Sequence, residues 1–230
     1  TAGALAQSIG LIAKVEVSGH DPGDSLVWAY GGASAFFTNY DMTNPKFTFT
    51  PEQCAKDSIS RGNGIFTLSR SFDKSDSITE QAFAVTRFLP EWKAVVKAGD
   101  SMQGESGLGD PAAFSGPPAA LVQGMDKETA GKVNCVAVRV VRLEPAPVPG
   151  FIVVGMGGNV DKAINDPASA FEAMLSRNRE IASRVVVRTP DPYLNAASTM
   201  MAFAIDGTWG DSTVMHGGWS WRFGYLGWRG

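Results

Sequence analysis

Residues 8 to 158 carry the feature that most restricts what this chain can fold into. Within them, apolar side chains alternate with polar ones or form short runs, and clusters of turn-forming residues interrupt the runs. The clusters are residues 18–24, 43–45 and 61–64 and a long loop at 98–118. A helix would place apolar side chains three or four residues apart, and this spacing is missing here. The pattern therefore predicts an antiparallel β domain.

Nine segments fit the strand pattern, and no helix is expected between them. They are residues 9–17, 25–30, 46–50, 64–70, 82–88, 92–97, 119–124, 133–143 and 151–155. Many short strands without intervening helices form packed antiparallel sheets rather than a parallel sheet. We therefore expect a mostly β protein, in which residues 1–158 form an antiparallel β-sandwich domain.

Length and composition narrow the class of protein. The chain has 230 residues, enough to bury a core without disulfide support, and its 44% hydrophobic and 19% charged residues exclude a disordered chain. A net charge of −3 gives no reason to expect nucleic acid or acidic lipid as a partner. No stretch reaches the roughly 18 apolar residues of a membrane span. We therefore expect a globular protein with no nucleic-acid partner and no membrane span.

The pattern changes near residue 160, where two helices are predicted to begin. Asp166 before Pro167, and Asp191 before Pro192, each combine a capping carboxylate with proline at the first helical position. The first helix is amphipathic and forms the main part of an expected linker, residues 159–190. The second, residues 193–205, is apolar on almost every side, which is typical of a helix buried on all sides. Because the rest of the chain is too small to surround it, we expect its packing partners to lie outside these 230 residues.

A glycine-rich stretch, residues 155–160, follows an apolar run and invites comparison with the dinucleotide-binding fingerprint. That fingerprint requires a third glycine and a helix that begins at the turn. Here Val160 replaces the third glycine, and the capping pattern places the helix start at Asp166. We therefore expect a glycine-rich exit from a last strand, and no cofactor.

The cysteines and histidines offer little chemistry. Cys54 and Cys135 form no C-x-x-C motif and have no neighbouring histidine, so a metal site is not expected. Buried free thiols are the favoured interpretation, with a disulfide as the alternative if the protein is exported. With only His20 and His216 available, a Ser-His-Asp triad has little support.

Residues 206–230 are the strongest candidate for a functional site. Four of the six tryptophans lie here, mixed with carboxylate, histidine and arginine side chains. Sugar rings pack their C–H faces on aromatic rings and their hydroxyls bond to charged groups, so the mixture is typical of a carbohydrate site. Asp206 ends an apolar helix, where the macrodipole disfavours a carboxylate, and this placement indicates a function. The same placement before Gly207 is also a common start of a turn.

The segment 189–230 resembles the six-hairpin glycosidase-like superfamily of bacterial polysaccharide-degrading proteins. The resemblance rests on Asp206-Gly207-Thr208-Trp209 and on the His-Gly-x-x-x-Trp-Arg segment that starts at His216. It is closest to an uncharacterised bacterial family of that superfamily. It implies a β-sandwich followed by an (α/α)₆ toroid, with residues 191–230 as the first helix and loop of the toroid.

The resemblance also implies an activity and site residues. Glycoside hydrolysis needs two carboxyl groups beside the scissile bond, and the catalytic candidates are Asp206, as the acid or as a substrate-orienting group, and Asp211. The candidates for substrate binding are Trp209, His216, Trp219, Trp221 and Arg222. The alternative for the tryptophans is that they pack the inner wall of the helical barrel.

Further expectations concern the parent protein. Its partner would be a carbohydrate, and its location periplasmic or extracellular. The residues after 158 are too few for a complete toroid, so we expect this chain to be an N-terminal fragment with an incomplete active site. The rest of the toroid would belong to the same parent chain.

Two rival functions stay open. In the first, the sandwich is a non-catalytic module that binds an oligosaccharide through exposed rings such as Trp28, Tyr30 or Trp92. In the second, the sandwich is structural and serves to dock the toroid.

Overall fold

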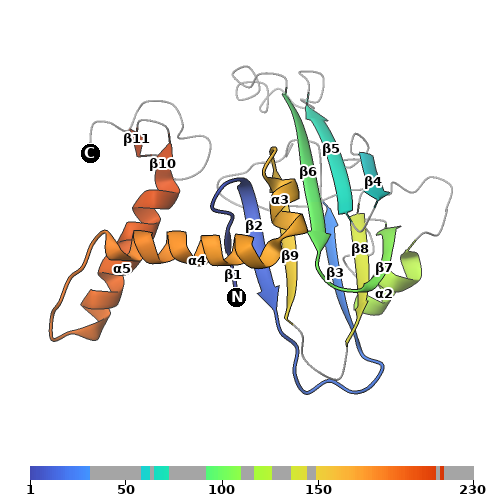
Figure 1. The fold of residues 1–230 in the computed structure, drawn as a ribbon, viewed down its shortest axis with the longest axis horizontal. Helices are drawn as coiled ribbons and strands as arrows, with labels where there is room; N and C mark the ends of the chain where they lie inside the picture. The colour runs from blue at the N-terminus through green and yellow to red at the C-terminus, as the bar shows by residue number, and fades with distance from the viewer. Residues whose placement is uncertain are drawn as a thin grey trace, which may run out of the picture. The chain divides into compact units, whose positions relative to one another are not determined.

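The structure is a computed structural model that describes residues 1–31, 58–62, 65–72, 92–109, 117–125, 136–143, 149–210 and 213–214 (Figure 1). The chain divides into two compact units, Thr1–Phe171 and Glu172–Gly230. The first unit contains the whole of the predicted sandwich domain. No helix in the described part of the chain is long and apolar enough to cross a membrane.

The larger sheet of the first unit is antiparallel, with strand order β1-β2-β9-β6-β5-β4 (Figure 1). Its strands are β1 (Ala2–Ala4), β2 (Ile9–Val15), β9 (Gly150–Met156), β6 (Trp92–Asp100), β5 (Ile65–Phe72) and β4 (Ser58–Gly62). Strand β2 pairs along its whole length with β9, from Ile9 opposite Met156 to Val15 opposite Gly150. Two segments far apart in sequence therefore lie side by side near the centre of the sheet.

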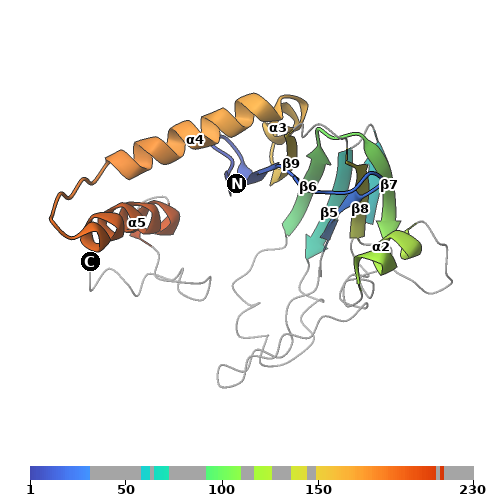
Figure 2. The ribbon, with the colours of Figure 1, turned by 90° about the horizontal axis from the view of Figure 1, so that it is seen from below.

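The smaller sheet is also antiparallel and has the order β3-β8-β7. Its strands are β3 (Ser25–Gly31), β8 (Val136–Arg142) and β7 (Gly104–Gly109). The central strand β8 is apolar on both faces, and Val136, Val138 and Val141 are buried. A short helix, α2 (Pro118–Gly124), lies beside this sheet in both views (Figures 1 and 2).

A shared hydrophobic core joins the two sheets. Phe66 on β5, Ala98 on β6 and Ala137 on β8 are each at most 2% exposed and form one cluster. Trp28 and Tyr30 of β3 pack against the same cluster. Since burying one large apolar side chain stabilises a fold by about 1.5–3 kcal/mol, this cluster holds the sheets together. The prediction of a mostly β protein with two antiparallel sheets is confirmed.

Six of the predicted strands are found, with ends shifted by a few residues: those at 9–17, 25–30, 64–70, 92–97, 133–143 and 151–155. The predicted strands at 46–50 and 82–88 lie outside the described residues. The pattern misses β1, β4 and β7. Strand β7 falls in the predicted loop 98–118, because its sequence, GESGLG, has three glycines that hide the alternation. It pairs with β8 from Gly104 to Gly109 all the same.

The predicted strand at 119–124 is wrong, because these residues form helix α2. Pro118 stands at a first helical position, where its missing N–H has no helical partner to lose. The following Ala-Ala-Leu run consists of strong helix formers. A short apolar run fits a strand or a buried helix equally well, and here the proline decides for the helix.

A second correction concerns the glycine-rich turn. Helix α3 (Val160–Asn165) begins directly after it, whereas the capping pattern places the helix start at Asp166. Its first residue is not preceded by a side-chain cap. Instead, the helix buries Val160, Ala163 and Ile164 and contacts β6 and β9, so tertiary packing replaces the missing cap. The strand before the turn, β9, pairs antiparallel with β2 and β6, which is not a dinucleotide-binding arrangement.

Both predicted caps are confirmed. Helix α4 (Pro167–Ser183) begins after Asp166, whose Oδ1 accepts a hydrogen bond from the Ser169 amide at 3.2 Å. Helix α5 (Pro192–Thr208) begins after Asp191, whose Oδ1 accepts one from the Tyr193 amide at 2.8 Å. After α5 comes a two-residue hairpin, β10 (Trp209–Gly210) with β11 (Thr213–Val214).

Candidate functional site

The predicted site begins at the end of α5. At the other end of this helix, Asn195 in its first turn bonds to Thr189 in the segment before it. Asn195 Oδ1 accepts the Thr189 amide at 2.8 Å, and Asn195 Nδ2 donates to the Thr189 carbonyl at 3.0 Å. Asn195 thereby ties the incoming chain to the helix. The starting point of α5 is fixed by these contacts together with the Asp191 cap.

On α5 the exposed face is apolar and the buried face is largely polar, which is the reverse of an ordinary surface helix. Its buried and half-buried face consists mainly of small or polar side chains: Asn195, Ser198, Thr199, Ala202, Phe203 and Asp206. Its other face is exposed and entirely apolar, and consists of Tyr193, Leu194, Ala197, Met200, Met201, Ala204 and Ile205. At 100° per residue, this second face spans about 140° of the helix.

We call this second face the outer face of α5. Tyr193 is 84% exposed, Met200 66% and Met201 63%. The sequence predicts a helix surrounded on all sides, and among the described residues nothing covers these side chains. An apolar surface of this kind marks an interaction site in most proteins.

Asp206 lies on the opposite, inner face, in the last turn of α5. Its Oδ2 accepts a hydrogen bond from Arg177 Nη2 at 2.5 Å, and its Oδ1 accepts one from Arg184 Nη1 at 3.0 Å. Both arginines stand at α4 or directly after it, and Arg184 also pairs with Glu180 at 3.2 Å. The side chain of Asp206 is only 18% exposed, against 37% for Arg177 and 51% for Arg184. The carboxylate is therefore held between two guanidinium groups that are partly open to solvent.

The carboxylates beside Arg184 stabilise its charged form. The pKa of Arg184 is raised above its ordinary value, first by the hydrogen bond to Glu180 and to a smaller extent by Asp206. In return, two positive charges offset the unfavourable position of Asp206 at the negative end of the α5 macrodipole. Both carboxylate oxygens act as acceptors in this arrangement.

Few of the other predicted site residues lie where the structure describes them. The backbone of Trp209 begins β10 and pairs with Val214. Asp211, His216, Trp219, Trp221 and Arg222 lie outside the described residues. Of the predicted site residues, the structure describes the side-chain partners of Asp206, and the roles of all of them, Asp206 included, stay predictions. Cys54 and Cys135 also lie outside the described residues.

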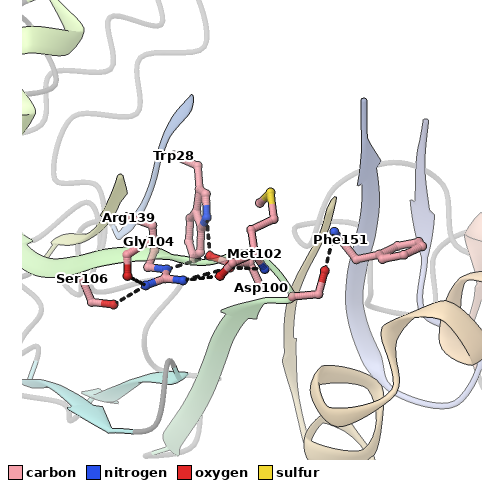
Figure 3. A network of polar contacts seen from close by, with 8 residues as sticks. Trp28, Asp100, Met102, Gly104, Ser106, Arg139 and Phe151 are labelled. Atoms are coloured by element: carbon pink, nitrogen blue, oxygen red, sulfur yellow. Dashed lines mark hydrogen bonds and ion pairs between the residues drawn. The ribbon is translucent and has the colours of Figure 1, made fainter. Parts of the chain in front are cut away.

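Another carboxylate bonded to arginine, that of Asp100, is fully buried between the two sheets of the first unit (Figure 3). Four hydrogen bonds reach its two oxygens. Oδ2 accepts Trp28 Nε1 and Arg139 Nε, both at 2.8 Å, and Oδ1 accepts Arg139 Nη2 at 3.0 Å and the Met102 amide at 2.8 Å. An ionised carboxylate has about four acceptor positions, so Asp100 is saturated.

Arg139 is saturated as well, with a side chain 6% exposed. Besides its two bonds to Asp100, it donates from Nη1 to the Gly104 carbonyl at 2.9 Å and to Ser106 Oγ at 2.6 Å, and from Nη2 to the Met102 carbonyl at 2.8 Å. All five N–H groups of the guanidinium are used. A pair with no free donor or acceptor has no capacity for a ligand, so we assign it to holding β6 of one sheet to β8 of the other.

This network also determines what Trp28 does. Its indole N–H is used by Asp100, and its ring meets the Phe66 ring edge-on, with centroids 6.1 Å apart. Tyr30 packs against the same cluster. Neither ring is thus placed as an exposed platform for a sugar. The side chain of Trp92 lies outside the described residues.

The glycine-rich turn at residues 155–159 is followed by an ion pair rather than by an anion site. Lys97 Nζ on β6 donates to both carboxylate oxygens of Asp161, at 2.7 and 2.6 Å, in the first turn of α3. A phosphate at this turn would meet the negative charge of Asp161. Among the described residues no cluster of three or more metal-ligating side chains occurs.

Sequence reasoning misses the arginines of both networks, although each leaves a signal. Arg139 interrupts the apolar run Val-Ala-Val-Arg-Val-Val, and a charge in a strand that is apolar on both faces requires a buried partner. Arg177, Glu180 and Arg184 are spaced three and four residues apart, which places them on one side of α4. In both cases the partner carboxylate is distant in sequence and no local pattern identifies it.

Comparison of the chain with protein-family models, with curated proteins and with solved structures finds no match. The function of the chain has to be inferred from its own residues and their geometry.

Proposed function

We propose that this chain is part of a glycoside hydrolase-like protein that acts on a polysaccharide, and that α5 is the first helix of its (α/α)₆ toroid. The outer face of α5 is the observation that carries the proposal. Tyr193, Leu194, Met200, Met201 and Ile205 are each at least 50% exposed there. In a toroid, neighbouring helices would cover such a face.

Leaving this face in water is costly. Each large apolar side chain gains about 1.5–3 kcal/mol from full burial, so five half-exposed ones forgo several kcal/mol. The starts of α4 and α5 are nevertheless well defined by the caps at Asp166 and Asp191. The outer face of α5 is apolar from Tyr193 to Ile205. The proposed occupant is the remaining set of toroid helices of the same parent chain.

The carbohydrate part of the proposal rests on the end of α5 and the residues after it. Asp206 is held in place within the last turn of the helix, and Trp209 starts the segment that contains four of the six tryptophans. Within this proposal, Asp206 and Asp211 are the carboxyl groups of the site. The aromatic side chains stack on sugar rings, while His216 and Arg222 bind hydroxyls.

The sandwich has a structural role in the proposed protein. The inward packing of Trp28 and the saturated Asp100–Arg139 pair support this role over direct sugar binding by the sandwich. A sugar-binding module would need exposed rings, and Trp28 and Tyr30 pack against the core instead.

The test is affinity electrophoresis of the full chain in gels that contain hydroxyethylcellulose, arabinoxylan or polygalacturonate. We expect at least one polysaccharide to retard the chain. Trp221→Ala should weaken that binding about fivefold, since one aromatic contact contributes about 1 kcal/mol. Tyr193→Ala, which removes an exposed ring outside the predicted site, serves as the control and should leave the mobility shift unchanged. Retardation by none of the three polysaccharides would contradict the proposal.

A further inference from the structure

The carboxylates of Asp100 and Asp206 differ in how completely they are bonded. Asp100 receives four hydrogen bonds, which fill its acceptor positions. Asp206 receives two from described residues, one on each oxygen. Its side chain also keeps 18% of its surface exposed, whereas that of Asp100 keeps none. The described residues therefore fill about half of the acceptor capacity of Asp206.

The two donors of Asp206 fix the direction of the carboxylate. Arg177 lies within α4 and Arg184 directly after its last residue, seven residues further on, so they reach the carboxylate from two separate points of the chain. An arginine bonded to one oxygen alone would leave the carboxylate free to rotate about its Cβ–Cγ bond. Two arginines on different oxygens hold both the position and the plane of the group.

We propose that Arg177 and Arg184 are positioning residues, which hold the Asp206 carboxylate so that the acceptor positions that no described residue fills receive hydroxyl groups of a neutral sugar. This inference rests on the proposed function, and it selects an orienting role for Asp206 over that of a general acid. A carboxylate between two guanidinium groups is an acceptor, and sugar hydroxyls are donors.

The charges of the cluster indicate an uncharged ligand. Arg177 and Arg184 supply two positive charges, and Asp206 and Glu180 supply two negative ones, all within one connected set of ion pairs. The set has no excess positive charge to attract the carboxylate of a uronic acid. A uronate would also have to compete with Asp206 for the same guanidinium groups.

The test is a double-mutant cycle on affinity, measured with hydroxyethylcellulose as the neutral probe and polygalacturonate as the acidic one. Asp206→Asn should weaken binding of the neutral probe about tenfold or more, because it removes a charged acceptor. Arg177→Lys and Arg184→Lys keep the charge but lose the forked geometry, and each should weaken binding severalfold. Arg179→Lys, a change at an exposed arginine of the same helix, is the matched control.

The cycle separates positioning from direct contact. If the arginines act through Asp206, Arg177→Lys should cause no further loss in the Asp206→Asn background. Additive losses would overturn the inference, because they would mean that the arginine contacts the ligand itself. Unchanged affinity of Asp206→Asn, or tighter binding of the acidic probe by the unmodified chain, would also overturn it while leaving the proposed function intact.

Failure of the unmodified chain to bind either probe or arabinoxylan would instead contradict the proposed function. The same double-mutant cycle, with the free energy of unfolding measured in place of affinity, would then still show whether Arg177 and Asp206 are coupled. Coupling in stability without any sugar binding would assign the pair to joining α4 and α5, and the inference would be wrong.

Discussion

Replacing Arg139 with leucine would remove the centre of the network that joins the two sheets. The substitution deletes five hydrogen bonds and leaves the Asp100 carboxylate, whose side chain is fully buried, with only the Trp28 and Met102 donors. It also leaves the Gly104 and Met102 carbonyls without this donor. Breaking a buried ion pair from one side costs about 3–5 kcal/mol, because an uncompensated charge stays behind.

That cost is a large part of a typical folding free energy of about 5–15 kcal/mol. For a chain of this size, 1 kcal/mol corresponds to roughly 2–4 °C in Tm, so Arg139→Leu should lower Tm by about 6–20 °C. The assay is urea and thermal unfolding followed by far-ultraviolet circular dichroism. Arg142→Leu, at an exposed position of the same strand, is the control and should change stability by about 0.5 kcal/mol or less.

The double variant Asp100→Leu with Arg139→Leu tests the reasoning itself. It removes both charges, so no buried ion is left unpaired, and it should be less destabilised than Arg139→Leu alone. A loss below about 1 kcal/mol for the single variant would refute the assignment of this pair as the link between the sheets. A double variant less stable than the single one would refute the argument from the uncompensated charge.

The remaining predictions concern local stability. The Ser169 hydroxyl and amide lower the pKa of Asp166 below its ordinary value of 3.8. The ionised Asp166 cap therefore stabilises the start of α4 fully above pH 3.8. This stabilisation is lost as the pH falls through the lower pKa of the folded state. Amide hydrogen exchange at Ser169 should therefore accelerate in that acidic range, and Asp166→Ala should remove this pH dependence; an unchanged pH profile in the variant would show that the cap is not responsible. Gly104→Ala should destabilise the first unit by about 1–3 kcal/mol in urea unfolding, because a Cβ there would lie 2.2 Å from the Val140 carbonyl oxygen. Gly62→Ala, where nothing lies within 4 Å, is the control, and equal effects at the two glycines would contradict the steric reason.

The contrast between Asp100 and Asp206 bears on the proposed function. Asp100 is saturated by its neighbours and stabilises the fold, whereas the described residues give Asp206 two hydrogen bonds, both from arginines. From sequence, only Asp206 attracts attention, because it ends a helix and precedes a tryptophan-rich segment. The arginines that decide what it can do are 29 and 22 residues away, and the geometry alone brings them together.

Local patterns determined much of the secondary structure. Alternation of apolar and polar side chains located six strands, because the two faces of a strand differ within a few residues of sequence. The two Asp-Pro pairs located the starts of α4 and α5, because a cap acts on amides two or three residues away. Where the pattern was weak, as in the glycine-rich strand β7 or the short apolar run of α2, it failed.

Tertiary structure alone decided the rest. Pairing of β2 with β9 brings together residues that are far apart in the chain. Helix α3 forms because its apolar residues pack against β6 and β9. The burial of Arg139 depends on Asp100, 39 residues earlier, and on carbonyls of the intervening chain. Periodicity and capping are properties of neighbouring residues, whereas the stability of a buried charge depends on every group that surrounds it, and only the folded chain brings those groups together.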